Sequence, residues 1–258
     1  MKTLNISTDE RGVVTVALNL PDTRNALSAQ MIQDLTEMAR TIGQSPETRV
    51  ILLKGNGKTF CAGGDLKWMQ EQINADRETR IKEARKLAMM LKSLNEMPAP
   101  LIGQIHGAAM GGGVGMACIC DITIADENTK FGLTETRLGL IPATISPYVI
   151  ARMGEGRARQ VFMSSKIFQA PEAERLGIIS KAVPTGTLED AVTQDIEPFL
   201  SVAPKAVGAA KRLARRLGPT IDEATINATI EALADTWDGE EAKAGIKAFL
   251  TKTKPPWG

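Results

Sequence analysis

The sequence predicts an α/β domain that is followed by a helical region. Candidate strands and amphipathic helices alternate up to about residue 185. From residue 188 to residue 250 almost every segment is rich in helix-forming residues, and a length of 258 residues suits one large domain as well as two small ones. We therefore expect a layered α/β part over residues 1–195 and a helical part over residues 196–258.

The first strands and helix are predicted from the spacing of apolar residues. Residues 14–18 alternate like a half-buried strand, with Val14, Val16 and Leu18 on one face. The turn-forming segment PDTRNALS, residues 21–28, precedes a helix, in which apolar residues recur at helical spacing from Met31 to Ile42. The apolar segment RVILLKG, residues 49–55, then predicts a buried strand.

The next elements continue the alternation. Residues 78–95 predict a second amphipathic helix, and strands are expected in APLIGQIHG (99–107) and DITIAD (121–126). Between those two strands, the glycine-rich segment GAAMGGGVGMACIC (107–120) predicts a loop that opens a short apolar helix. In the C-terminal region, Pro198, Pro204 and Pro219 are expected to separate the helices.

Composition excludes several classes of protein. The chain has 31 Lys and Arg against 30 Asp and Glu, a net charge of +1, which gives no general attraction to nucleic acid or to a membrane surface. The polar N-terminus does not resemble a secretion signal, and no apolar run reaches the roughly 18 residues of a membrane span. We expect a cytoplasmic protein with three buried, reduced cysteines. A single His and no paired Cys or His motif argue against a metal site.

Two glycine motifs resemble nucleotide-binding loops but lack essential residues. GNGKTF, residues 55–60, would need a glycine at Leu52 to form a P-loop. A dinucleotide-binding fingerprint that starts at Gly111 would need a glycine at Met116. Neither segment predicts a nucleotide site.

The glycine loop can instead supply unpaired backbone amides. The start of a helix carries free N–H groups and a partial positive charge, and glycine lets a ligand oxygen approach them closely. FCAGGDL, residues 60–66, forms a second corner of small residues after a strand. Two such corners could donate to one oxygen and stabilise a developing oxyanion. Close packing between strand and helix is the alternative explanation of the glycines.

Five segments together resemble the enoyl-CoA hydratase/isomerase (crotonase) family. They occur in the family's order: RNALS, FCAGGDL, HGAAMGGGVG, FGLTETRLGLIP and FLTKTKPPW. The resemblance implies a crotonase-like ββα spiral core with the acyl-CoA site at residues 1–195, and a helical trimerisation region at 196–258. It also implies an acyl-CoA substrate with no separate cofactor, and a homotrimer or a dimer of trimers.

The resemblance also assigns site residues. It implies that the N–H groups of Gly64 and Gly112 hold the thioester oxygen and that Glu135 is the catalytic acid and base. A second family glutamate is replaced here by Gly115. The residues that match coenzyme A contacts of the family are Arg24, Ala26, Ala62, Asp65 and Leu66.

Other polar or aromatic residues are expected either at the site or in the core. Trp68 is expected to shape the acyl pocket, Tyr148 to line its end or pack in the core, and His106 to be a packed strand residue. Lys252 or Lys254 is expected near the coenzyme A phosphates of a neighbouring subunit. Without the resemblance to the family, Glu135 would be interpreted as a surface carboxylate or as one that forms a salt bridge, for example with Arg137.

Three functions remain open. The first is hydration of an enoyl-CoA by Glu135 alone, and the segment at 131–150 with Gly115 looks most similar to methylglutaconyl-CoA hydratases of bacterial leucine breakdown. The second is double-bond isomerisation with Glu135 as the proton shuttle. The third is a non-catalytic relative that binds coenzyme A or RNA. A dehalogenase would need an aspartate where the chain offers only Thr144 and Ser146.

Overall fold

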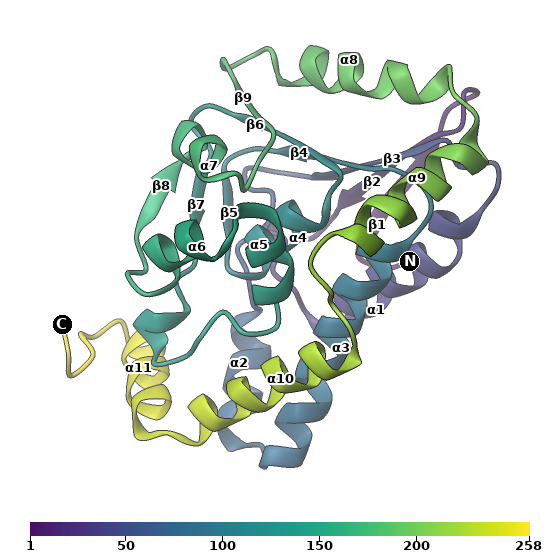
Figure 1. Cartoon of the computed structure of the whole chain (residues 1–258). Coiled ribbons are helices and arrows are strands. Elements are labelled where there is room, and N and C mark those ends of the chain that lie inside the picture. The colour runs from purple at the N-terminus through teal and green to yellow at the C-terminus, as the bar shows by residue number, and fades with distance from the viewer.

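A computed structural model describes all 258 residues of the chain. Its centre is a six-stranded sheet in the order β1-β2-β3-β4-β6-β9 (Figure 1). The first pair is antiparallel, and the other neighbours run parallel, as expected of an α/β fold. The strands are β1 (Leu4–Thr8), β2 (Val13–Leu18), β3 (Val50–Gly55), β4 (Leu101–Ile105), β6 (Ile122–Asp126) and β9 (Lys181–Val183).

A second, smaller sheet lies beside the first and was not predicted from the sequence. It contains β5 (Ala108–Met110), β7 (Lys130–Gly132) and β8 (Ile167–Gln169) in the order β5-β7-β8. Each strand has only three residues, which is too short for a recognisable alternation of apolar and polar side chains. Phe131 and Phe168 stack across the β7–β8 pair, with ring centroids 6.3 Å apart.

The helices expected in the first half are present. The predicted helix after residue 28 is α1, where the Ser28 side chain caps the first turn, and the predicted helix at 78–95 is α3, which Asp76 caps. The helical elements up to β9 are η1 (Pro21–Thr23), α1 (Ala29–Arg40), η2 (Ile42–Gln44), α2 (Leu66–Asn74), α3 (Arg77–Glu96), α4 (Gly112–Ile119), η3 (Glu135–Leu138), α5 (Ser146–Met153), α6 (Glu155–Phe162) and α7 (Ala170–Leu176).

Apolar residues cover both faces of the six-stranded sheet. In β3, Ile51 and Leu53 belong to the large core that also contains residues of α1, α3, α4 and α5. Val50 and Leu52 alternate with them and pack on the other face, against residues of α8. This period of two explains why the strand is a continuous apolar run.

The last part of the chain is helical, with α8 (Leu188–Leu200), α9 (Pro204–Leu217), α10 (Glu223–Asp238) and α11 (Glu240–Thr251). Pro198 was expected to separate two helices, but it lies inside α8, close to that helix's C-terminal end. The expected division after residue 195 also falls within α8. Because Val192 and Ile196 of this helix pack on the sheet, α8 is attached to the α/β layers. No helix combines the length and apolar character needed to cross a membrane.

The final two helices pack against elements from the middle of the sequence (Figure 1). Helix α10 packs along α3 through Ala84, Ala88, Ile226 and Ile230. Arg77 on α3 reinforces this contact by pairing with three acids of α10, namely Glu231, Asp235 and Asp238. Helix α11 packs against η3. The C-terminal region therefore covers the part of the fold where the predicted catalytic glutamate lies.

Candidate active site

A cavity of about 780 Å³ contains most of the predicted site residues. Its walls come from the corner after β3, the first turns of α2 and α4, η3, the loop before α5, and the last two helices. More than half of its lining residues are hydrophobic. The predicted residues that line it are Arg24, Ala26, Ala62, Gly64, Asp65, Leu66, Trp68, Gly112 and Glu135.

The two glycine corners meet at this cavity. Cys61 of the first corner pairs with Ala109 of β5, directly before the second corner, through backbone hydrogen bonds of the kind found in a sheet. Gly63 makes the close approach possible, because it has a φ of +94° and a side chain there would come within 2.9 Å of the Met110 carbonyl oxygen. Strand β5 therefore brings Gly64 next to the beginning of α4.

Both predicted oxyanion donors have available N–H groups. The N–H of Gly64 makes no hydrogen bond in the structure, and Gly64 lines the cavity. Gly112 is the first residue of α4, so its N–H has no acceptor within the helix, and the capping residue Gly111 has no side chain to supply one. The geometry can thus provide two backbone donors to a ligand oxygen from different elements.

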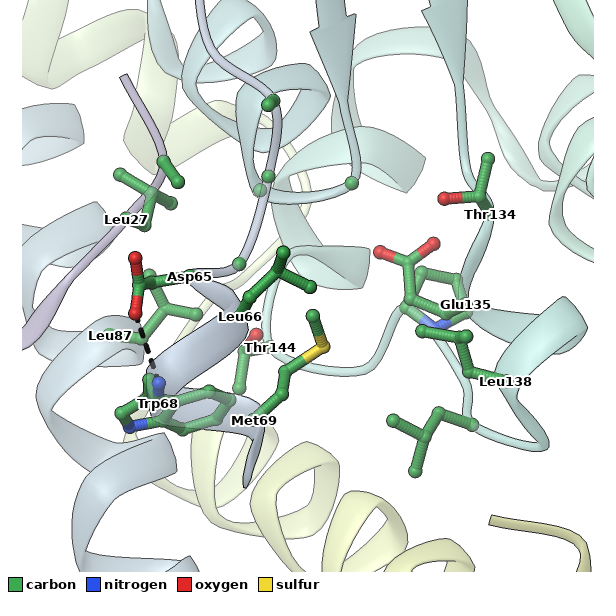
Figure 2. A pocket seen from close by; sticks show the side chains of 18 of the residues that line it. Leu27, Asp65, Leu66, Trp68, Met69, Leu87, Thr134, Glu135, Leu138 and Thr144 are labelled. Atoms are coloured by element: carbon green, nitrogen blue, oxygen red, sulfur yellow. Dashed lines mark hydrogen bonds between the residues drawn. The ribbon is translucent and has the colours of Figure 1, made fainter. Parts of the chain in front are cut away.

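Glu135 lies at the start of η3, and its carboxylate points into the cavity (Figure 2). A side chain at Gly111 would come within 2.9 Å of its Oε1, so this glycine leaves room for the carboxylate. Its Oε2 is buried and has no hydrogen-bond partner. Glu135 forms no ion pair with Arg137, which was the alternative interpretation of this residue.

Burial changes the acid strength of Glu135. Removal of the carboxylate from water raises its pKa from the ordinary 4.5 to about 7. A carboxyl group with this pKa exists in both protonation states near neutral pH. It can therefore act as a proton acceptor and as a proton donor in one reaction.

Ile145 occupies the space into which a side chain at position 115 would project. A Cβ atom at Gly115 would lie 2.4 Å from Cγ2 and 2.9 Å from Cβ of Ile145. Ile145 is 2% exposed and lines the cavity from the loop before α5. Glu135 is therefore the only glutamate that lines the cavity, and an apolar group occupies the space where a side chain at position 115 would be.

The segment RNALS, which was predicted to contact coenzyme A, is connected to the first glycine corner by a backbone hydrogen bond. The Ala62 N–H donates to the Arg24 carbonyl oxygen at 3.0 Å. Asn25, which was not predicted as a site residue, is fully buried and donates from its side chain to the Asn56 and Thr59 carbonyl oxygens. Its φ of 53° is left-handed, a conformation in which Asn is enriched, so an Asn within the turn-forming segment was the signal available from the sequence.

Asp65 and Trp68 occupy the start of α2. The Asp65 carboxylate accepts a hydrogen bond from the Trp68 N–H at 3.0 Å and so caps this helix (Figure 2). The Trp68 side chain lines the cavity. Asp65 therefore has a structural role in addition to its place at the cavity.

Several predicted residues lie outside the cavity. Tyr148 is 3% exposed in the main core, and its hydroxyl has no partner. Lys252 and Lys254 are exposed and do not line the cavity of their own chain. His106 was expected within a strand, but it follows the end of β4, where its ring Nε2 is 2.9 Å from the Gly57 carbonyl oxygen.

Residues that were not predicted from the sequence complete the walls of the cavity. Leu233, Trp237 and Phe249 of α10 and α11 line the cavity, and so do Thr134 and Thr144. No local pattern marks the three apolar residues, because they reach the site only when the last helices fold back. No group of three or more His, Cys, Asp or Glu side chains is placed to hold a metal ion.

The chain is similar to known proteins over nearly its whole length. The model of the protein family described as "Enoyl-CoA hydratase/isomerase" matches residues 8–258 of this chain. An enoyl-CoA isomerase/hydratase of Mycosarcoma maydis is 31% identical, with 96% of this chain and 93% of that protein covered. The crystal structure of an enoyl-CoA hydratase from Shewanella pealeana is 36% identical, with a TM-score of 0.81 and 99% and 96% of the two chains covered. That of an enoyl-CoA hydratase from Mycobacterium avium is 28% identical, with a TM-score of 0.86 and both chains fully covered.

Proposed function

Because the chain belongs to the enoyl-CoA hydratase/isomerase family, we propose that it adds water to the double bond of an enoyl-CoA thioester. In this proposal the N–H groups of Gly64 and Gly112 form the oxyanion hole, and Glu135 is the only acid and base. The observation that carries the proposal is the convergence of these three groups on one cavity.

The chemistry can proceed with a single carboxyl group. Glu135 in its carboxylate form accepts a proton from water while the water oxygen forms a bond to C3 of the substrate. The electrons of the double bond move to the thioester oxygen, where the two backbone N–H groups stabilise the enolate. Protonated Glu135 then donates the same proton to C2, and the thioester carbonyl re-forms. The pKa of about 7 suits both steps.

We propose a substrate similar to 3-methylglutaconyl-CoA, an intermediate of leucine breakdown that carries a second carboxylate. The resemblance of residues 131–150, together with Gly115, supports this choice. Arg137 lines the cavity and forms no ion pair with a side chain of the protein, so its guanidinium is available to a substrate carboxylate.

The assembly and location are further parts of the proposal. By resemblance to the family we propose a homotrimer or a dimer of trimers in the cytoplasm. Lys252 or Lys254 would then contact the coenzyme A phosphates of a neighbouring subunit, and no further cofactor would be needed. The exposure of both lysines is compatible with such a contact.

Gly115 and Ile145 favour isomerisation as a second candidate function. Ile145 fills the space beside Gly115, which removes a second acid that could activate water. A single carboxylate is enough to take a proton from C2 of a 3-enoyl-CoA and to return it to C4. The same oxyanion hole would stabilise the intermediate.

One experiment separates these functions. The wild type, Glu135→Gln and the exposed control Glu10→Gln are incubated in deuterated water with crotonyl-CoA, 3-methylglutaconyl-CoA or 3-hexenoyl-CoA, and products are identified by mass spectrometry. A product that has gained one D₂O in the wild type and the control, but not in Glu135→Gln, supports hydration. A conjugated product without added water supports isomerisation. Full activity of Glu135→Gln would contradict both mechanisms.

The same preparation tests a non-catalytic relative. Binding of crotonyl-CoA without any turnover would favour a coenzyme A-binding protein. Retention of RNA that decreases with salt would favour an RNA-binding protein. The net charge of +1 argues against the latter.

A further inference from the structure

The turn that carries Glu135 is held between two parts of the chain. Turn η3 has only four residues, Glu135 to Leu138, and its Thr136 and Arg137 contact Ser165 on one side. The hydroxyl groups of Thr136 and Ser165 are 2.6 Å apart, and the Arg137 N–H donates to the Ser165 hydroxyl at 3.2 Å. Ser165 is buried, so these contacts are shielded from water.

On the other side, α11 touches the backbone of the turn directly. A Cβ atom at Gly245 would lie 2.6 Å from the carbonyl carbon and 2.7 Å from the carbonyl oxygen of Leu138. A Cβ atom at Gly139, immediately after the turn, would lie 2.4 Å from the carbonyl carbon of Glu241. Both contacts are with backbone atoms, which cannot rotate away as a side chain could.

The apolar side chains around this contact keep α11 in place. Ala242 and Ile246 are fully buried and pack with Leu140 and Trp237 in a separate hydrophobic cluster. The Leu140 N–H also donates to the Glu135 carbonyl oxygen at 3.1 Å. The cluster is thus linked by a backbone hydrogen bond to the residue that carries the carboxylate.

We propose that helix α11 positions Glu135 through the backbone contact at Gly139 and Gly245, with Ser165 holding the opposite side of the turn. The proposal rests on the proposed role of Glu135 as the acid and base. It gives the last helix of the chain a function in the active site of its own subunit, apart from any role in assembly. Gly139, Ser165 and Gly245 are positioning residues, because none of them lines the cavity.

The position of η3 also controls the environment of the carboxylate. The Glu135 Oε2 is buried without a partner, and its burial raises the pKa of the side chain to about 7. A shift of the turn would let water reach this oxygen, and the pKa would fall towards the ordinary value. This gives a readout that a change in stability alone would not produce.

Gly245→Ala is the direct test. The added methyl group must push α11 and η3 apart, and a displacement of about 1 Å near reacting groups can lower a rate about 100-fold. Alanine is itself a better helix former than glycine, so the intrinsic stability of α11 is not reduced. Gly156→Ala in α6 is the matched control, since a methyl group there has nothing within 4 Å.

Two measurements are made on the full-length chain. The first is kcat and KM with crotonyl-CoA or 3-hexenoyl-CoA from pH 5 to 9. The second is the carbon-13 NMR titration of the Glu135 carboxyl group, whose signal is identified by its absence in Glu135→Gln. We expect a 10- to 100-fold lower kcat in Gly245→Ala, a KM within about twofold, and a pKa lower by about one pH unit or more. Gly156→Ala should match the wild type in both measurements.

A second variant loosens the turn instead of pushing it. Ser165→Ala removes both side-chain contacts to η3 and should lower kcat and the Glu135 pKa in the same direction. It also serves as the test if Gly245→Ala does not fold. Wild-type kcat and wild-type titration in both variants would overturn the positioning role.

Failure of the proposed function would be seen separately. If Glu135→Gln kept full activity, Glu135 would not be the acid and base, although the NMR titration could still show that α11 sets its pKa. If Glu135→Gln were inactive and Gly245→Ala behaved like Gly156→Ala, only the positioning role would be wrong.

Discussion

Replacement of Glu135 by glutamine should stabilise the protein at alkaline pH. The carboxyl group has an ordinary pKa of 4.5 in the unfolded chain, and burial raises it to about 7 in the folded protein. Well below pH 4.5 the carboxyl group is protonated in both the folded and the unfolded protein, so Glu135 makes no pH-dependent contribution to stability. Between about pH 4.5 and pH 7 the unfolded chain releases the proton while the folded protein keeps it, and the free energy of unfolding therefore falls as pH rises.

The size of the effect follows from the two pKa values. One pKa unit corresponds to about 1.4 kcal/mol, so the full penalty above pH 7 is about 3 kcal/mol. Glutamine resembles the protonated carboxyl group in shape but cannot ionise. We expect Glu135→Gln to unfold with a free energy about 3 kcal/mol higher than the wild type at pH 8.5, and with nearly the same value at pH 4.

Urea denaturation at several pH values measures this difference. The proteins are compared at equal concentration, because any assembly would add to the apparent stability. The exposed residue Glu10 provides the control variant Glu10→Gln, which should follow the wild type at every pH. A constant difference between Glu135→Gln and the wild type from pH 4 to 8.5 would refute the argument that burial raises the Glu135 pKa.

Three further predictions concern the glycine corners and the cysteines. Gly64→Ala should keep kcat within a few-fold of the wild type, because an added Cβ has nothing within 4 Å. Gly64→Pro removes the N–H and should lower kcat about 100- to 1000-fold. Equal kcat values for the two variants would exclude the Gly64 N–H as an oxyanion donor. Gly115→Ala should cost about 1–3 kcal/mol in urea denaturation, and Ile145→Ala should remove most of that cost in the double variant; strictly additive effects would contradict direct contact. Burial raises the pKa of each cysteine thiol to about 12, so iodoacetamide at pH 8 should modify the unfolded chain but not the native protein, as judged by mass spectrometry.

The elements that the sequence predicted well are those with a strong local pattern. The strand at 49–55 and the helix at 78–95 are confirmed as β3 and α3, within a residue or two at each end. Their apolar residues repeat over a long enough segment to set the period. The two glycine corners were also identified, because small residues after a strand leave open amides wherever the chain goes next.

The features that were not predicted depend on residues that are distant in sequence. Ile145 fills the space beside Gly115 only because α5 packs on α4, and nothing in the local sequence of either residue shows this. Phe249 reaches the cavity because α11 folds back over η3. Tyr148 illustrates the reverse case, since the sequence allowed both a pocket and a core position and its helix turns it into the core.

The packing of α11 against η3 has a consequence for biosynthesis. The cavity has walls from Asp22 near the beginning of the chain to Phe249 near its end, so a ribosome must make almost the whole chain before the cavity can close. At about 5–20 residues per second, α11 is completed roughly 3–14 s after β9, the last strand of the large sheet. During that interval the sheet can form while Leu138 and Leu140 remain uncovered. The large sheet of a nascent chain can thus form before the walls of the cavity are complete.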